Sequence, residues 1–350
     1  MKAGVLFGNK DIRYTDYEEP QIKNPTDVKI RVRATGICGS DVPRVHDNGA
    51  HFYPIVLGHE SAGEVVEIGS EVKNVKVGDT VSLAPLLPCK CCPDCYSGNY
   101  ALCKNYSFVG SREQGAFADY LVVPCDNAVV YDSSIPFDQA AMFEPATVAL
   151  HGLLHNNFKG GEDVAIIGCG TIGILTVQWA RIMGAKRIVA FDVAKERLDL
   201  ALEMGATEVI NSMDKDFIEQ AMKLTDNKGF KYVFDVVGMP STILNCFKIA
   251  GNKANLCLIG TPHGDITFTY KEWELINRKE FNLTGSWMSY SAPFPGKEWE
   301  LTAHYLKTGE LKIHKDFIYK KFPMSEIDKA FALYENPRDV KGKIMLINDK

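Results

Sequence analysis

The most restrictive feature of the sequence is a set of four cysteines, Cys89, Cys92, Cys95 and Cys103, spaced as C-x2-C-x2-C-x7-C. This spacing lets one loop place four thiolates around a single tetrahedral Zn²⁺, with every coordination position filled by protein. The stretch has no apolar periodicity that would fold it unaided, so we predict a structural zinc that orders it. Two alternatives stay open: a cysteine-rich loop without metal, and a shift of register that brings in the additional thiol of Cys91.

Length, charge and cysteine usage limit the class of protein. A chain of 350 residues is long enough for about two domains. Its net charge of −5, with no basic run, argues against a nucleic-acid partner. The N-terminal apolar run is too short for a signal peptide, and no stretch approaches the roughly 20 apolar residues of a membrane helix. Ten cysteines without a secretion signal indicate a reducing compartment, so we expect a cytoplasmic protein without a membrane partner.

The pattern of short apolar segments changes near residue 148. Before it, short strands are punctuated by glycine and proline, which indicates a β-rich, barrel-like unit. These strands are expected at Val28–Arg33, Ser61–Ile68, Thr80–Ala84 and Ala118–Val123. Beyond it, apolar strands alternate with helical stretches, which indicates a parallel, doubly wound sheet. Those strands are expected at Val164–Ile167, Arg187–Phe191, Glu208–Asn211, Tyr232–Val236 and Ala254–Ile259.

A glycine-rich turn, G168-C-G-T-I-G173, directly follows the first strand of this second pattern and opens a helix that is expected to run to about Arg181. Gly168 would make the tight turn, Gly170 would let the backbone approach a pyrophosphate, and Gly173 would let the helix pack closely on the strand. The helix N-terminus would supply N–H donors for the phosphates. The other expected cofactor-binding residues of the turn are Thr171 and Ile172.

A carboxylate at the end of the second strand completes this motif. Asp192 lies 19 residues after Gly173, where it would accept hydrogen bonds from a ribose 2′-hydroxyl and repel a 2′-phosphate. We therefore predict dinucleotide binding with NAD favoured over NADP, and we include Arg197 in the cofactor site. The alternative for Asp192 is a solvated surface carboxylate.

A second candidate metal centre is dispersed along the chain. Cys38, in G36-I-C-G-S-D41, and His59, in G58-H-E60, are good zinc ligands beside glycines. A catalytic zinc needs a third protein ligand and an open position, and Glu144 is the best candidate. Taken singly, each has an ordinary alternative: a buried free thiol, a core histidine or a solvated carboxylate.

Taken together, these motifs resemble the zinc-dependent medium-chain dehydrogenases over essentially all 350 residues. The resemblance implies a GroES-like, β-rich catalytic domain (residues 1–147 with 286–350) and an inserted Rossmann domain that binds NAD (residues 148–285). It implies a catalytic zinc on Cys38, His59 and Glu144, with Glu60 beside it, and a structural zinc on the four cysteines. Relatives form dimers and tetramers, so a homodimer or homotetramer is expected. A final helix at Glu298–Thr308 and a strand at residues 340–347 would return to the first domain.

At the position of the third zinc ligand, this chain has Glu144 where the simple alcohol dehydrogenases have a cysteine. In this respect it resembles the polyol dehydrogenase group of the family. Further resemblance in N48-G-A-H-F-Y-P-I-V-L-G-H-E60 and in G285-S-W-M-S-Y-S-A-P-F-P-G-K-E-W-E300 implies a secondary alcohol of a sugar-alcohol phosphate as substrate. The expected reaction is oxidation of galactitol 1-phosphate to tagatose 6-phosphate by NAD. The alternatives are oxidation of a sorbitol or L-iditol type polyol or of butanediol, and a non-enzymatic nucleotide-binding protein. Sorbitol dehydrogenases usually carry an arginine where this chain has Met288, which weakens the sorbitol assignment.

Several side chains are candidates for contact with substrate. Ser40 would relay the hydroxyl proton outward, although it is also placed to cap the following turn. A phosphate needs local cations because the chain as a whole is acidic. The candidates for binding the phosphate are Arg44 first, then Arg112 and Lys297. The candidates for lining or covering the sugar pocket are His51, Tyr53, Trp287 and Tyr290.

Overall fold

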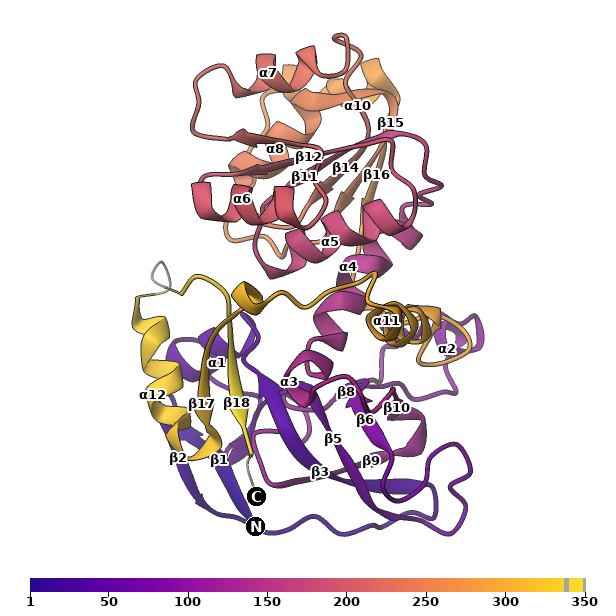
Figure 1. Ribbon diagram of the computed structural model, residues 1–350, viewed down its shortest axis with the longest axis vertical. Coiled ribbons are helices and arrows are strands. Elements are labelled where there is room, and N and C mark those ends of the chain that lie inside the picture. The colour runs from indigo at the N-terminus through magenta and orange to yellow at the C-terminus, as the bar shows by residue number, and fades with distance from the viewer. Residues whose placement is uncertain (337–339, 349–350) are drawn as a thin grey trace. The chain divides into compact units, whose positions relative to one another are not determined.

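The computed structural model describes residues 1–336 and 340–348, which form two compact units (Figure 1). The first unit contains Met1–Glu144 and the described residues from Tyr290 onward, and the second contains Pro145–Ser289. The boundaries predicted from the sequence lie a few residues away from these, and as domain boundaries they stay a prediction.

One long strand organises the first unit. β3 (Asp27–Gly36) pairs antiparallel with β5 (Glu60–Ile68), β9 (Tyr120–Pro124) and β18 (Lys343–Ile347). β-Branched residues fill the buried side of these strands, where they pack well on a pleated surface. The remaining strands of this sheet are β6 (Thr80–Leu83), β10 (Ala128–Val130) and β17 (Ile318–Pro323). The four strands expected before residue 148 all correspond to strands of this sheet. The strand expected at Ala118–Val123 begins two residues later, at Tyr120.

A smaller sheet and several short helices complete the first unit. An apolar cluster that includes Leu6, Ile55 and Phe331 packs the smaller sheet against the helix that contains Phe331. The smaller sheet contains β1 (Lys2–Gly8), β2 (Asp11–Asp16) and β4 (Ile55–Val56), and β7 (Leu86–Leu87) pairs with β8 (Ser107–Phe108). The helices are α1 (Asp41–His46), α2 (Pro93–Tyr96), α3 (Phe137–Ala140), α11 (Lys297–Thr308) and α12 (Ile327–Ala332). Short 3₁₀ turns are formed by Tyr100–Leu102, Cys125–Asn127, Lys315–Phe317, Met324–Glu326 and Leu333–Glu335.

The end of the chain returns to the first unit, as expected. In β18, Met345 lies opposite Gly36 and Leu346 opposite Thr35, so the last strand extends the sheet beside β3. This pairing places Lys343, at the start of β18, beside Ile37 and Glu60, which lie near the beginning of the sequence.

The second unit is a six-stranded parallel sheet in the order β13-β12-β11-β14-β15-β16. Each of its central strands carries a run of buried apolar residues, as parallel strands covered on both faces require. The order reverses between β11 and β14, which creates the switch point where such sheets bind ligands. The strands are β11 (Asp163–Ile167), β12 (Arg187–Asp192), β13 (Glu208–Asn211), β14 (Phe230–Asp235), β15 (Ala250–Leu258) and β16 (Asn282–Gly285).

Helices cover both faces of this parallel sheet. α5 and α6 lie on one face and α8 and α10 on the other (Figure 1). The helices are α4 (Phe143–His155), α5 (Thr171–Ile182), α6 (Lys195–Glu203), α7 (Phe217–Lys223), α8 (Pro240–Ile249), α9 (Tyr270–Trp273) and α10 (Leu275–Lys279). A β-rich unit followed by a doubly wound parallel sheet is the fold class expected from the sequence, which is thereby confirmed. Among residues 1–336 and 340–348, no helix has the length and apolar character needed to cross a membrane.

Candidate active site and metal centres

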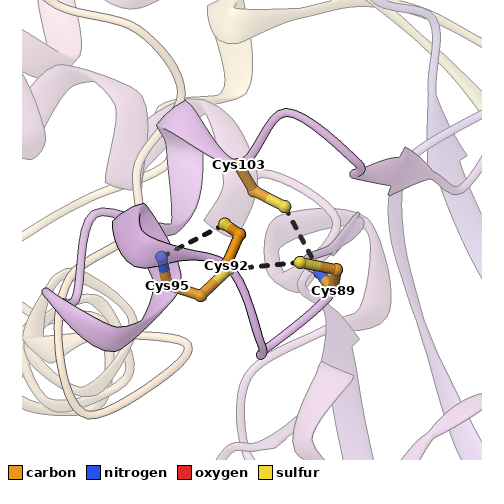
Figure 2. Close-up of side chains that lie close together, drawn as sticks. All are labelled: Cys89, Cys92, Cys95 and Cys103. Atoms are coloured by element: carbon orange, nitrogen blue, oxygen red, sulfur yellow. Dashed lines mark hydrogen bonds between the residues drawn. The ribbon is translucent and has the colours of Figure 1, made fainter.

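The four spaced cysteines converge in the first unit. The sulfurs of Cys89, Cys92, Cys95 and Cys103 all lie within 4.8 Å of one another (Figure 2). Cys92 caps the short helix α2 by accepting a hydrogen bond from the backbone N–H of Cys95 at 3.5 Å. The N–H of Cys89 donates to the sulfur of Cys103 at 3.4 Å. Local backbone structure therefore sets the positions of the thiols.

The geometry of these thiols fits a zinc ion. Tetrahedral zinc with Zn–S bonds of about 2.3 Å separates its sulfurs by roughly 3.8 Å, and the sulfurs of Cys89 and Cys95 are 4.0 Å apart. Burial raises the pKa of the Cys95 thiol to about 12, so ionisation of this buried thiol requires a nearby cation such as zinc. The assignment of these four residues as zinc ligands is a proposal that the geometry supports.

The second candidate metal centre is assembled by strand register. Cys38 lies in the turn between β3 and α1, while His59 and Glu60 lie at the start of β5. Because β3 and β5 are neighbours with Gly36 opposite Glu60, the two segments meet at one point. A Cβ on Gly36 would lie 2.5 Å from a carboxylate oxygen of Glu60. Glycine at residue 36 therefore leaves room for the Glu60 carboxylate.

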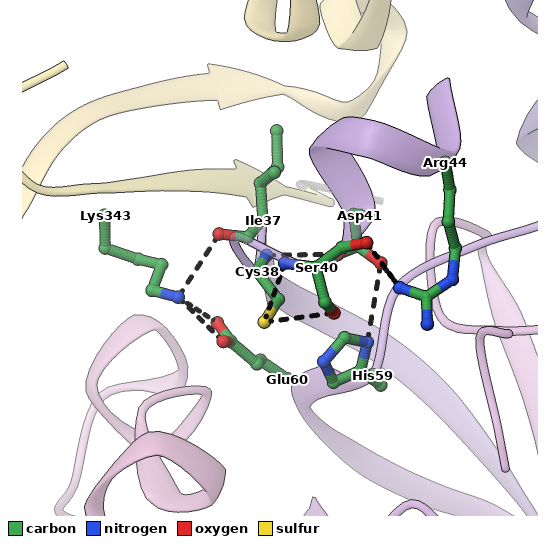
Figure 3. Close-up of polar contacts among 8 residues, drawn as sticks. All are labelled: Ile37, Cys38, Ser40, Asp41, Arg44, His59, Glu60 and Lys343. Atoms are coloured by element: carbon green, nitrogen blue, oxygen red, sulfur yellow. Dashed lines mark hydrogen bonds and ion pairs between the residues drawn. The ribbon is translucent and has the colours of Figure 1, made fainter. Parts of the chain in front are cut away.

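Three potential ligand atoms come together at this point. The sulfur of Cys38, a ring nitrogen of His59 and a carboxylate oxygen of Glu60 lie within 4.8 Å of one another (Figure 3). His59 and Glu60 are buried, whereas Cys38 is half-buried. A soft thiolate, an imidazole and a carboxylate form a donor set that suits zinc. This donor set therefore fits a zinc with three protein ligands, which leaves one position of a tetrahedral site unfilled by these residues.

Asp41 lies behind the histidine of this site. Its fully buried carboxylate accepts a hydrogen bond from the N–H of Cys38 at 3.0 Å and lies 3.6 Å from Nδ1 of His59. The other ring nitrogen of His59 faces Cys38 (Figure 3). Burial acts to lower the pKa of His59, but the charges of Asp41 and Cys38 outweigh burial and raise it to about 10. A carboxylate behind a ligating imidazole fixes the ring and strengthens it as a ligand.

Lys343 provides a second buried charge beside the same site. Its ammonium lies 2.6 Å from Glu60 and also donates to the carbonyl of Ile37 at 3.2 Å. Burial acts to lower the pKa of Lys343, but the Glu60 and Cys38 charges raise it above the usual lysine value. The ammonium therefore stays charged and is the ion-pair partner of the buried Glu60 side chain.

Glu144 lies near this group but does not belong to it. The residue is at the start of α4, and its charge acts on His59 and Glu60. Burial and the Glu60 charge raise the pKa of Glu144 to about 7. The three donors that lie within 4.8 Å of one another are Cys38, His59 and Glu60. The choice of Glu144 as third ligand stays a prediction, and Glu60 is the carboxylate that stands closest to a ligand position.

Ser40 and Arg44 flank this metal centre. The hydroxyl and N–H of Ser40 approach the sulfur of Cys38 at 3.4 and 3.5 Å, and the hydroxyl makes no capping hydrogen bond to α1. Arg44 donates to the carbonyl of Ser40 at 2.5 Å and lies 4.0 Å from Asp41. Part of the Arg44 charge is therefore already balanced by Asp41.

Two exposed side chains of the first unit lie near Arg44. Burial and then the charges of Arg112 and Arg44 lower the pKa of His51, so these three basic groups occupy one neighbourhood. Arg112 stacks over the ring of Tyr106 at 4.8 Å. Within residues 1–336 and 340–348, no carboxylate forms an ion pair with Arg112.

The aromatic candidates are distributed more widely. The Tyr53 hydroxyl donates to Asn9 at 2.8 Å on the surface of the first unit. Tyr290 is buried in that unit, where its hydroxyl accepts from the N–H of Leu86 at 2.9 Å. Trp287 belongs to the second unit and is half exposed. Contact of any of these three with substrate stays a prediction.

The glycine-rich turn of the second unit has the structure that a dinucleotide needs. Gly168 has φ +103° and is too close to Val237 to carry a Cβ, and a Cβ on Gly173 would lie 1.9 Å from the carbonyl oxygen of Gly168. In contrast, a Cβ on Gly170 would meet nothing within 4 Å. The open space at Gly170 fits the close approach of a pyrophosphate to the backbone at the N-terminus of α5, where Thr171 and Ile172 form the first turn.

Asp192 is held at the end of β12, beside this turn. Its carboxylate accepts hydrogen bonds from the N–H groups of Cys169 at 2.7 Å, Val193 at 2.8 Å and Ala194 at 2.9 Å. Arg197, on α6, lies 4.0 Å from the same carboxylate. Asp192 is therefore a fixed part of the turn, with its charge adjacent to the expected ribose position.

Sequence reasoning missed the roles of Asp41 and Lys343. Asp41 belongs to the motif G36-I-C-G-S-D41 around Cys38. Its closeness to Cys38 in that motif was the only feature of the sequence that could have indicated a role at the metal centre. Lys343 is separated from Glu60 by 283 residues, and only the pairing of β18 with β3 places the two together.

Comparison with known proteins agrees with this fold. Residues 24–133 match the family described as alcohol dehydrogenase GroES-like domain, and residues 171–304 match the family described as zinc-binding dehydrogenase. The chain belongs to the zinc-dependent medium-chain dehydrogenases, and the resemblance seen in the sequence is confirmed. It is an oxidoreductase of the alcohol and polyol dehydrogenase type.

Individual relatives have several named activities. Galactitol 1-phosphate 5-dehydrogenase of Escherichia coli is 39% identical over 99% of this chain and 100% of its own. The crystal structure of the E. coli galactitol-1-phosphate dehydrogenase has a TM-score of 0.94 at 36% identity and covers 99% and 100% of the two chains. An L-threonine 3-dehydrogenase of Symbiobacterium thermophilum is 32% identical over 93% of this chain and 91% of its own. A zinc-binding dehydrogenase structure from Sinorhizobium meliloti, bound to NADP, has a TM-score of 0.89 at 28% identity, covering 99% and 98%.

Proposed function

We propose that this chain oxidises galactitol 1-phosphate to tagatose 6-phosphate with NAD. The observation that carries the proposal is the 39% identity to galactitol 1-phosphate 5-dehydrogenase along nearly the whole chain. The reaction converts a secondary alcohol and NAD⁺ into a ketone, NADH and a proton. Two zinc ions per chain are proposed, one held by the four clustered cysteines and one by Cys38, His59 and a carboxylate.

The residues around Cys38 have distinct roles in this proposal. Zinc bound there supplies Lewis acidity toward the substrate hydroxyl, and NAD accepts the hydride. Asp41, 3.6 Å from Nδ1 of His59, is placed to hold the imidazole, and Lys343 pairs with Glu60. Ser40 is exposed and in contact with Cys38, so its hydroxyl is placed to take the substrate proton and pass it to solvent. Replacement of Ser40 with alanine should slow turnover and change its pH dependence, and an unchanged pH–rate profile would exclude this role.

NAD in preference to NADP is supported by Asp192. A 2′-phosphate placed beside this carboxylate would meet a like charge at a position that three backbone N–H groups hold fixed. Arg197, at 4.0 Å, is the cation that would favour NADP instead. The ratio of kcat/KM for NAD to that for NADP therefore measures which of the two charges dominates.

The phosphate of the substrate is proposed to bind Arg112, His51 and Arg44. Burial and the charges of Arg112 and Arg44 lower the pKa of His51, and a bound anion would offset those two charges. Arg112 offers a guanidinium without a carboxylate partner among the described residues, and a guanidinium binds phosphate oxygens in bidentate geometry. We expect Arg112 to contribute more than Arg44, whose charge is shared with Asp41.

Initial rates of NADH formation test this proposal. Galactitol 1-phosphate, galactitol, sorbitol and L-threonine would be compared at matched concentrations, and kcat/KM should be highest for the phosphorylated substrate. Arg112→Met should lower kcat/KM for galactitol 1-phosphate by about 10–100-fold, or roughly 1.4–2.8 kcal/mol, and leave galactitol unchanged. Arg13→Met is the matched control, because Arg13 pairs with Asp11 on the surface. Preference for an unphosphorylated polyol or for L-threonine would refute the phosphate assignment.

A further inference from the structure

A buried carboxyl group stands at the switch point of the parallel sheet and has no role in the chemistry described above. Asp235 is the last residue of β14 and lies opposite Ile167 at the end of β11. Its side chain is fully buried. Oδ2 accepts a hydrogen bond from the N–H of Gly238 at 2.8 Å, whereas Oδ1 has no hydrogen-bond partner among residues 1–336 and 340–348. A buried oxygen without a partner costs folding stability, so stability alone does not explain Asp235.

Asp235 is bonded to both of the loops that follow β14 and β15. Through Gly238 its carboxyl group holds the β14 loop, defined as residues 236–239. Its backbone carbonyl accepts two N–H groups, at 2.8 and 3.0 Å, from the β15 loop, defined as residues 259–263. Gly238 has φ +79°, and a Cβ on it would lie 2.0 Å from the carbonyl oxygen of Thr261. The two loops therefore pack backbone to backbone, and Asp235 fixes both.

The β14 loop also packs directly on the glycine-rich turn. A Cβ on Gly168 would lie 2.4 Å from Cγ2 of Val237 and 3.0 Å from Cγ2 of Val236. The N–H of Val236 donates to the carbonyl of Ile167, the residue before the turn, at 3.1 Å. The β14 loop therefore stands beside the turn where the strand order reverses, which is the place where such sheets bind ligands.

The turn and Asp192 assign the two halves of a dinucleotide to different strands. The pyrophosphate would lie at the N-terminus of α5, with the adenosine ribose beside Asp192 at the end of β12. The strand order β12-β11-β14 leaves the opposite side of β11 for the nicotinamide half. The nicotinamide half therefore extends over the β14 loop, whose position Asp235 sets.

The turn itself is held without help from Asp235. The N–H of Gly168 donates to the carbonyl of Phe191 at 2.7 Å, and the N–H of Cys169 donates to Asp192 at 2.7 Å. Both acceptors belong to β12, on the far side of the turn from β14. Loss of the carboxyl group of Asp235 should therefore loosen the β14 loop while the site for adenosine and diphosphate stays intact.

We propose that Asp235 is a positioning residue for the nicotinamide half of NAD, because it holds the β14 loop in place through Gly238. The residue acts through this loop and takes no part in hydride transfer. This inference rests on the proposed use of NAD as cofactor. Its consequence is that a variant at residue 235 should lose affinity for NAD and keep its affinity for ADP, which has no nicotinamide half.

The dissociation constants of NAD and ADP, measured by calorimetry on the purified chain, test this proposal. Asp235→Val removes the acceptor and should raise the Kd for NAD about tenfold, while the Kd for ADP changes less than about twofold. Asp235→Asn keeps an acceptor for the N–H of Gly238 and should bind NAD within about threefold of the wild-type chain. Asp163→Val is the matched control, because Asp163 begins β11 at the opposite end of the sheet, and it should change neither constant.

An unchanged Kd for NAD in Asp235→Val, or equal weakening of NAD and ADP, would overturn the proposal. So would an Asp235→Asn variant as weak as Asp235→Val, since the acceptor would then not matter. A wild-type chain that binds neither nucleotide would instead refute the proposed cofactor.

Hydrogen exchange on the wild-type chain covers the case in which Asp235→Val fails to fold. Bound NAD should slow exchange in the β14 loop, whereas bound ADP should slow it only in the glycine-rich turn. Protection of the β14 loop by ADP as strong as that by NAD, or no protection by either, would contradict the placement of the nicotinamide half.

Discussion

The two candidate metal centres of the first unit are built in opposite ways. The cysteine lobe, residues 89–103, takes all its donors from one loop, and two of its thiols are buried. The Cys38 centre takes donors from the ends of β3 and β5, with Asp41, Glu144 and Lys343 around them. A closed set of four donors is typical of a structural zinc, and a set of three with an open side is typical of a catalytic zinc. The comparison shows that local sequence order encodes the first kind of site, whereas strand pairing creates the second.

The largest effect is expected from breaking the lobe. Cys95→Ser removes a buried thiol from a loop without a hydrophobic core of its own, and structural zinc contributes about 10–16 kcal/mol of binding free energy to such loops. A loss of about 8 kcal/mol of that free energy would lower Tm by roughly 10 °C in a chain of this size. Thermal unfolding with zinc analysis measures both effects, with Cys125→Ser as the matched control. An unchanged Tm in Cys95→Ser would show that the lobe does not depend on metal.

The second-largest effect distinguishes the two centres, because a variant of the Cys38 centre should lose activity and a variant of the cysteine lobe should lose stability. Cys38→Ser should reduce kcat/KM by at least about 10³-fold, or roughly 4 kcal/mol, while Tm falls by less than about 4 °C. The reason is that Cys38 is half-buried in a turn that the hydrogen bond to Asp41 also holds. Activity and melting temperature would be measured on one preparation. A variant that unfolds like Cys95→Ser would remove the distinction between the centres.

Lys343 tests whether long-range pairing really builds the Cys38 centre. Lys343→Met leaves the buried Glu60 carboxylate without its partner and should cost about 3–5 kcal/mol of folding stability. Lys29→Met is the matched control, since Lys29 is equally buried but pairs with the partly exposed Glu19, and it should cost less. Chemical denaturation measures both values. Equal losses in the two variants would show that Lys343 has no special connection to the site.

The smallest effect is expected at the glycine-rich turn that is proposed to bind the cofactor. Like the cysteine lobe, this turn is formed by residues that are close together in the sequence. Asp192→Asn keeps the shape of the side chain but removes its charge, so KM for NAD should rise about tenfold, or roughly 1.4 kcal/mol, and preference over NADP should shrink. Asp199→Asn is the control, because Asp199 pairs with Lys195 on the exposed side of α6. An unchanged NAD to NADP ratio in Asp192→Asn would remove this carboxylate from cofactor selection.

Sequence reasoning succeeded where neighbours in sequence are neighbours in space. The cysteine spacing and the glycine turn each encode their geometry within a few residues, and the alternation of strands with helices predicted the parallel sheet. The order of motifs also pointed to Cys38 and His59, which the register of β3 and β5 brings together. The resemblance to one enzyme family added the expected substrate.

The remaining parts of the site depend on packing that no local pattern records. Lys343 reaches Glu60 because the last strand pairs with β3, and the sequence around Lys343 has no feature that sets it apart from other lysines. Tyr290 was a candidate for covering the substrate, and its buried hydroxyl bonds to a backbone N–H instead of facing solvent. Arg44 was the first choice for the phosphate, but a buried Asp41 shares its charge. Burial and charge partners are properties of the folded chain.

The most direct test of this account is a chelator titration of the purified protein, followed by native mass spectrometry, activity and melting temperature together. We predict two zinc ions per chain, of which one leaves first and takes the activity with it while the protein stays folded. The second should leave only with unfolding of the lobe. A chain with a single zinc, or two ions that leave together with activity and stability, would contradict the distinction between an open catalytic centre and a closed structural one.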